Sequence, residues 1–406
     1  MDRREWIKLS AAAAGATFGS KWGAAQVPAR GAAKDSMSAK MNAPYENPLS
    51  KGPFDNLPAQ LRLWDFQPTS IFKIPVTKIE KARYPVIDLH QHGLHEKPDP
   101  VQAIDNMVKT MDAVGVERSV IFTGTGEPGK FAQISKLYAA HPGRFNLWCS
   151  FDLTGLNSAG FGPKALDALE QCRHLGAEGI GEITDKGFGI GSELSGATIV
   201  QGAHPDDARL APLWEKAGRL GMPISIHVSD PIWVYQAMDN HNDWLPAAWT
   251  WRIPPTPGLL DQDGLIQSLE RAVQNHPKTI FSACHLIQQD YDLERLGEIL
   301  DRHPNLYADL SARLQEISTI PRFSGAFIQK YQDRIVYGTD FDYNDEAIRC
   351  EFRTLETLDE HFYIVYPGYN HSFWPMNGLG LPDAVLKKLY RDNALRIYQR
   401  AHDNAA

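Results

Sequence analysis

The stretch VIDLHQHG, Val86 to Gly93, joins an apolar run to an aspartate and to two histidines that are one residue apart. Alternate side chains of an extended strand point to the same side, so we expect His90 and His92 to project together. Two imidazoles in this arrangement suit a divalent metal ion. The pair alone does not distinguish a metal site from a buried strand that ends in two hydrogen-bonded polar residues.

Seven further apolar, β-branched runs follow along the chain, with segments of helical periodicity between them. The predicted strands are 85–89, 118–123, 146–152, 179–183, 223–227, 279–284, 305–310 and 334–339. The predicted helices are 101–114, 130–141, 163–175, 207–220, 264–275, 292–303, 314–332 and 382–400. This alternation is typical of a closed (β/α)8 TIM barrel. An open, doubly wound parallel sheet is the alternative, because counting elements does not prove closure.

The chain of 406 residues has room for one large domain with extensions. We expect a twin-arginine-type signal peptide at 1–25, a linker and N-terminal extension at 26–83, and the barrel domain at 84–402. Arg3 and Arg4 precede an Ala- and Gly-rich run that is too short to span a bilayer, which predicts export to the periplasm. A disordered basic tail of a cytosolic protein is the alternative.

Charge and cysteine content narrow the class of protein. The formal net charge is −8 and no long basic block is present, which excludes general nucleic-acid binding and favours a small-molecule substrate. No stretch predicts a membrane span. The four cysteines form no CxxC motif, and Cys149 and Cys284 lie in apolar runs, where a free thiol usually behaves as a small buried hydrophobe.

Other predicted strands end in groups that match the HxH pair. His227 follows the fifth strand, His285 the sixth and Asp340 the eighth. Because the carboxyl ends of barrel strands converge on one mouth, residues far apart in the sequence can meet there. Core packing alone would not place such groups at four strand ends.

With these residues the sequence resembles the amidohydrolase-related family (amidohydrolase family 2) of metal-dependent barrels, in the branch that includes aminocarboxymuconate-semialdehyde decarboxylase. The resemblance covers about 84–398 and is carried by DLHQH (88–92), ISIHVSDP (224–231), ACHL (283–286), YADLSAR (307–313), YGTDF (337–341) and YRDNALRIY (390–398). It implies that the metal ligands or their near neighbours are His90, His92, His227 and Asp340. It also implies that His285 is either a histidine that supports the ligands from behind or a catalytic histidine that steers the bound water.

Glu182 departs from the family pattern. It ends the fourth strand, in GIGEITDKG, where many members have other polar residues. A carboxylate there could be an extra ligand that bridges a second metal ion, a substrate contact or a structural group. The sequence leaves these three roles open.

The resemblance implies an enzyme with one divalent ion, and Zn²⁺ is expected, with Mn²⁺ and Fe²⁺ as alternatives. Imidazoles and a carboxylate hold such an ion with an open position, and the ion lowers the pKa of its water to about 7. Asp340 can accept the proton of that water and pass it to a leaving group. We expect hydroxide attack on an ester, lactone or amide of a small anionic or ring-containing molecule. Non-oxidative decarboxylation is the alternative, and a non-catalytic barrel that binds a sugar or a partner chain is a third.

Substrate contacts are predicted in the loops at the mouth. Long insertions follow the fifth strand (about 228–262) and the eighth (about 341–381). The first contains Asp230 and Trp233, which could contact substrate, although we expect most aromatic residues of the insertions to pack or to form a homodimer contact. Arg313 could bind a substrate carboxylate or form a surface salt bridge.

Overall fold

The computed structural model describes residues 68–158, 161–191, 200–253, 256–341, 343–364 and 373–405. The predicted signal peptide and residues 26–67 of the predicted extension lie outside this part of the chain. Residues 68–83 of the extension contain no helix or strand. They are held to the barrel domain by Thr77, whose backbone N–H and hydroxyl each donate to the Asp359 carboxylate at 2.7 Å.

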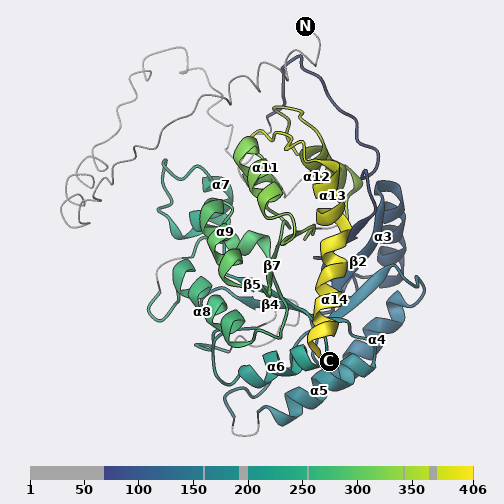
Figure 1. The fold of residues 1–406 in the computed structure, drawn as a ribbon, viewed down its shortest axis with the longest axis vertical. Coiled ribbons are helices and arrows are strands. Elements are labelled where there is room, and N and C mark those ends of the chain that lie inside the picture. The colour runs from purple at the N-terminus through teal and green to yellow at the C-terminus, as the bar shows by residue number, and fades with distance from the viewer. Residues whose placement is uncertain are drawn as a thin grey trace, which may run out of the picture. The chain divides into compact units, whose positions relative to one another are not determined.

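Eight parallel strands form one curled sheet in chain order (Figure 1). They are β1 (Val86–Asp88), β2 (Val116–Phe122), β3 (Phe145–Cys149), β4 (Gly179–Asp185), β5 (Ile224–Val228), β6 (Phe281–Ala283), β7 (Leu306–Asp309) and β8 (Ile335–Val336). The segments after β1 and β8 are joined by bonds of 3.0 Å from Leu89 N–H to Tyr337 O and from Asp340 N–H to His90 O. The predicted TIM barrel is confirmed, and the open doubly wound sheet is wrong.

Helices cover the outer face of this sheet (Figure 1). The larger ones are α3 (Pro100–Val114), α4 (Pro128–Tyr138), α5 (Pro163–His174), α6 (Ala211–Arg219), α8 (Gln262–Asn275), α9 (Leu293–Arg302), α11 (Pro321–Lys330), α12 (Asp345–Glu356) and α14 (Asn393–Ala405). Four of them begin at a proline, which has no N–H to leave unpaired in the first turn. In α3, Asp99 caps the N-terminus by accepting from Gln102 N–H, and Gly115 ends the helix at φ 89°.

The remaining described helices are short. They are η4 (Ile232–Tyr235), α7 (Leu245–Trp251), η5 (His285–Gln288), α10 (Leu314–Ile317), α13 (Asp383–Lys387) and η6 (Lys388–Asp392). In the described part of the chain, none of the helices combines the length and the apolar character that a membrane crossing needs. The four cysteines are free thiols.

The helix predictions need correction at 314–332 and in the insertion 341–381, whereas the helix predicted at 382–400 is confirmed as a continuous helical run. The predicted helix 314–332 is two helices, α10 and α11, because Pro321 starts a new helix rather than continuing the old one. Helix α12 lies inside the predicted insertion 341–381 and was missed; Asn344 caps it through Ala347 N–H. The predicted helix 382–400 consists of the contiguous segments α13, η6 and α14.

A buried carboxylate ties the first strand to the last. Asp88 accepts hydrogen bonds from the Thr339 hydroxyl at 2.7 Å, from Tyr343 OH at 2.9 Å, and from the backbone N–H groups of Thr339 and His90 at 3.1 Å. Burial raises the pKa of Asp88 to about 6 despite these four donors. Asp88 therefore closes the barrel below the mouth and is not itself among the groups that face the mouth.

We expect Thr339→Val to lower the free energy of unfolding by about 1–3 kcal/mol, because Asp88 then loses a buried donor. Urea unfolding at pH 7.5 measures the loss. Thr279→Val is the matched control: its buried hydroxyl donates at 2.8 Å to the neutral carbonyl of Trp214, so its loss should be smaller. Equal losses in the two variants would contradict a special role for the Asp88 contact.

Candidate metal centre

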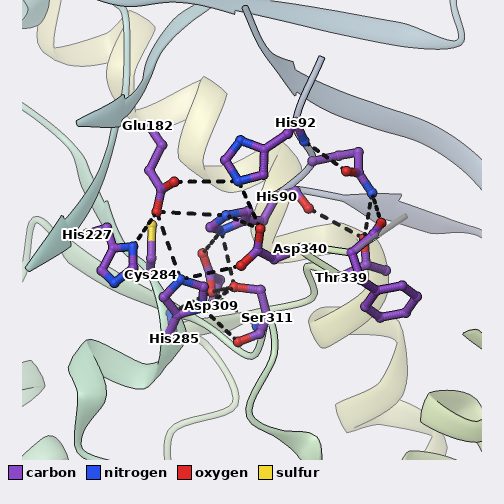
Figure 2. Close-up of polar contacts among 12 residues, drawn as sticks. His90, His92, Glu182, His227, Cys284, His285, Asp309, Ser311, Thr339 and Asp340 are labelled. Atoms are coloured by element: carbon purple, nitrogen blue, oxygen red, sulfur yellow. Dashed lines mark hydrogen bonds and ion pairs between the residues drawn. The ribbon is translucent and has the colours of Figure 1, made fainter. Parts of the chain in front are cut away.

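Six side chains meet at the carboxyl ends of five strands (Figure 2). They are His90 and His92 after β1, Glu182 in β4, His227 in β5, His285 after β6 and Asp340 after β8. All except His92 and Asp340 have side chains that are at most 8% exposed. The structure thus brings together every residue predicted as a metal ligand or catalytic group.

The donor atoms of His90, His92 and Asp340 have the spacing of ligands around one ion. Asp340 Oδ1 lies 2.9 Å from His92 Nε2 and 3.3 Å from His90 Nε2. Ligand atoms about 2.0–2.2 Å from a tetrahedral metal ion are about 3.4 Å apart. Asp340 has a left-handed backbone with φ 58°, a strained conformation for a non-glycine residue that places its carboxylate between the imidazoles.

Glu182 faces four imidazoles. Its Oε1 lies 2.8 Å from His227 Nδ1 and 3.9 Å from His285 Nε2, and its Oε2 lies 3.6 Å from His92 Nε2. A third distance from Oε1, to His90 Nε2, is 3.9 Å. Of the three roles left open by the sequence, this geometry favours a ligand.

Buried atoms without hydrogen bonds test whether these residues fit a metal ion. Within the described residues, His90 Nε2, Glu182 Oε1 and His227 Nδ1 are buried and make no hydrogen bond, although the last two are only 2.8 Å apart. An unpaired buried polar atom costs about 1–3 kcal/mol. A divalent cation that accepts these lone pairs removes the cost, so the residues fit a metal ion.

The donors form two groups of three. The atoms of His90, His92 and Asp340 lie within 4.8 Å of one another, as do those of Glu182, His227 and His285. Because Glu182 also approaches both histidines of the first group, its carboxylate can serve an ion held by either group.

Two residues behind the site fix the histidine rings, and sequence reasoning did not single them out. Asp309 Oδ2 lies 3.0 Å from His90 Nδ1, and Asp309 Oδ1 accepts from the His285 backbone N–H at 2.8 Å. The Ser311 carbonyl lies 2.9 Å from His285 Nδ1. Since Nδ1–H of both rings donates backwards, each Nε2 presents its lone pair to the site. The available signal was the place of Asp309 at the end of the seventh strand.

The two predicted catalytic groups, His285 and Asp340, differ in their charge at pH 7. Burial, with a further contribution from His227, lowers the pKa of His285 to about 3, so its imidazole is neutral at pH 7. Burial disfavours an ionised Asp340, yet His90 and His92 outweigh this effect and hold its pKa well below the ordinary value. The site therefore pairs a neutral base with a carboxylate.

We expect Asp309→Asn to weaken metal binding by about 10–100-fold, because the His90 ring loses its carboxylate partner. Competition with a chromophoric chelator measures the dissociation constant. Glu270→Gln is the control, since Glu270 accepts from His303 at 2.9 Å on the outer side of the barrel. Unchanged affinity in Asp309→Asn would contradict the role of Asp309.

A strained turn after β6 supplies another partner. Residues 285–288 all have φ between 54° and 57° and are buried, a run that side chains other than glycine rarely adopt. It places the Gln288 amide nitrogen 3.1 Å from His227 Nε2, while Gln288 Oε1 makes no hydrogen bond within the described residues. An amide rotated by 180° would accept His227 Nε2–H through Oε1, and the Nδ1 lone pair of His227 would then face an ion beside Glu182.

Two of the predicted substrate residues, Asp230 and Trp233, lie in the insertion after β5 but have different neighbours. Asp230 Oδ1 lies 3.9 Å from His227 Nε2 and 3.3 Å from Lys186 Nζ. Trp233 is stacked on Trp244 at 5.7 Å in a small apolar cluster of the insertion, as expected for most of its aromatic residues. Whether Asp230 and Trp233 contact substrate stays a prediction.

Arg313 is buried, with a side-chain exposure of 5%, so the surface salt bridge is wrong. Its Nη1 donates to the Ala312 carbonyl at 2.8 Å and lies 3.8 Å from Glu316 Oε1. Asp290 is a second buried acid that interacts with Arg313, and burial raises its pKa to about 7. Glu316 and Asp290 thus both interact with the guanidinium of Arg313. The binding of a substrate carboxylate by Arg313 stays a prediction.

Asp290→Asn should gain stability relative to the wild type as the pH rises. The folded pKa of Asp290, about 7, is above the ordinary 3.8, so its contribution to stability is complete below about pH 4 and is lost by pH 7. Asparagine has no such dependence. Urea unfolding of both proteins at pH 5 and pH 8 should show a difference that shifts by about 1.4 kcal/mol per pH unit at most; a constant difference would contradict the raised pKa.

Comparison with known proteins shows the family of the chain. The amidohydrolase family model matches residues 87–400. No curated protein matches the chain. Similar solved structures include an uncharacterised TIM-barrel protein of Bordetella bronchiseptica (14% identity, 78% of this chain and 99% of that chain, TM-score 0.46), an amidohydrolase of Burkholderia multivorans with bound zinc (12%, 77% and 99%, 0.45) and the IDCase of Metarhizium anisopliae (14%, 78% and 97%, 0.45). Since the family model matches more than half of the chain, the chain belongs to the amidohydrolase family and is a metal-dependent hydrolase or decarboxylase.

Proposed function

We propose that the protein is a hydrolase that cleaves an ester, lactone or amide of a small anionic or ring-containing molecule, with one zinc ion as cofactor. The observation that carries this proposal is the position of His285, whose Nε2 lies 3.6 Å from Asp340 Oδ2 beside the donor cluster. A neutral imidazole and an ionised carboxylate at that spacing can remove a proton from water and return it to a leaving group.

The residues divide into a holding set and a proton-transfer set. His90, His92, His227, Glu182 and Asp340 are the side chains that would hold the ion, which supplies Lewis acidity and an acidified water when bound. The Nε2 atom of His285 takes the proton, because its Nδ1–H is committed to the Ser311 carbonyl. Asp340 Oδ2, 3.6 Å from that nitrogen, receives this proton from His285 and passes it to the departing oxygen or nitrogen of the substrate, so both groups return to their starting state.

Product analysis in H₂¹⁸O tests the reaction type. The zinc-loaded protein is incubated with a panel of lactones, aryl esters, anilides and aromatic carboxylic acids, and the products are identified by mass spectrometry. Hydrolysis of an ester, lactone or amide gives an acid that carries one ¹⁸O. Release of CO₂ from a carboxylic acid, without ¹⁸O in the remaining product, would contradict hydrolysis and assign the protein to the decarboxylases. Asp340→Asn is the control for activity from a contaminating enzyme.

A further inference from the structure

A thiol lies at the edge of the donor cluster and has no part in the function proposed above. Cys284 directly follows β6 and is 1% exposed. Its Sγ, a nitrogen of His90 and a carboxylate oxygen of Glu182 lie within 4.8 Å of one another, and Figure 2 shows the sulfur next to the Glu182 carboxylate. The sequence suggested only a small buried hydrophobe at this position.

We propose that Cys284 is a further ligand of the metal ion, bound as a thiolate together with His90 and Glu182. This inference rests on the metal dependence of the proposed function. When the ion binds, the S–H bond breaks, an S–metal bond forms and the proton leaves to the buffer. The atoms that the thiolate would join, His90 Nε2 and Glu182 Oε1, are both buried and make no hydrogen bond within the described part of the chain.

Distances permit the three donors to reach one ion. Zn–S and Zn–N bonds of about 2.3 and 2.0 Å place the two donor atoms about 3.5 Å apart in a tetrahedron. In the structure the three donor atoms are at most 4.8 Å from one another. Side-chain movements of about 1 Å would bring them to bonding distance from one ion. The Ser225 hydroxyl lies 3.2 Å from Sγ on the neighbouring strand β5 and can donate a hydrogen bond to the thiolate.

Ligand softness favours the same arrangement. Thiolate ligands select Zn²⁺ over Mn²⁺ and Mg²⁺, which prefer oxygen donors. Cys284 would thereby determine which metal the site retains.

Cobalt substitution tests the proposal, because Co²⁺ reports a sulfur ligand through a charge-transfer band in the near ultraviolet. The full-length protein is freed of metal, loaded with Co²⁺ and examined by absorption spectroscopy. We expect the band in the wild type, its loss in Cys284→Ser with cobalt still bound, and no change in Cys149→Ser. Cys149 is the matched control, a buried thiol of β3 whose Sγ donates to the Gly179 carbonyl.

A second measurement needs no variant. X-ray absorption of the zinc-loaded wild type should show a sulfur neighbour at about 2.3 Å from zinc. Stoichiometric cobalt or zinc with only nitrogen and oxygen neighbours would overturn the role of Cys284 and leave the proposed hydrolase intact. A protein that binds neither metal would overturn both proposals together.

Discussion

Replacing His90 and His92 together by alanine should abolish metal binding and the stability that the ion supplies. The two imidazoles lie 3.3 and 2.9 Å from Asp340 Oδ1 and leave no nitrogen donor in that group when removed. With free Zn²⁺ at a thousand times the dissociation constant, the wild type gains about 4 kcal/mol in free energy of unfolding. The double variant should gain almost nothing and should lose turnover with it.

Urea unfolding with and without Zn²⁺ measures this gain after the protein has been freed of metal. His141→Ala is the control. The His141 ring lies outside the donor cluster, where its Nε2 is 2.7 Å from Asp105 Oδ1. This variant should keep the full gain in stability from Zn²⁺. If the double variant were stabilised by zinc as much as the wild type, the ion would be bound elsewhere and the site would be misassigned.

His285→Asn should lower kcat by about 10²–10⁴-fold while the metal content stays at the wild-type level. The imidazole is held through Nδ1 by the Ser311 carbonyl and presents Nε2 to Asp340, the geometry of a base. Asparagine can still donate to that carbonyl, but it cannot take up a proton. Loss of metal in parallel with loss of turnover would make His285 a ligand and would contradict its assignment as the base.

Steady-state kinetics and elemental analysis of the same preparation separate these outcomes. Glu182→Gln provides the comparison, because it removes the charge that faces four imidazoles. In that variant we expect metal content and turnover to fall together. The two variants thus distinguish a group that holds the ion from one that moves a proton.

The fold was predictable because its signals are local. Each strand of a covered parallel sheet is a short apolar, β-branched run, and all eight predicted strands overlap the observed ones. The convergence of His90, His227 and Asp340 also followed, since barrel geometry brings strand ends together whatever their separation in sequence. Helix α12 was missed because it lies in a segment read as an insertion, where the cap at Asn344 and the apolar stripe behind it went unrecognised.

The partners behind the ligands could not be predicted, because their roles depend on which neighbouring strand they face. Asp309 is one aspartate among many until the structure places it against the His90 ring. Gln288 reaches His227 only through a left-handed turn that no residue preference signals. Cys284 looks like core packing in sequence, and only the three-dimensional arrangement puts its sulfur beside Glu182.

Metal content per chain tests the central claim most directly. The protein is purified without a His tag or chelator, and metals are quantified by elemental mass spectrometry against protein concentration. We predict about one equivalent of zinc per chain, as for a catalytic site with three or more protein ligands. A chain that carries no metal, and that takes up none from added Zn²⁺ or Mn²⁺, would contradict it.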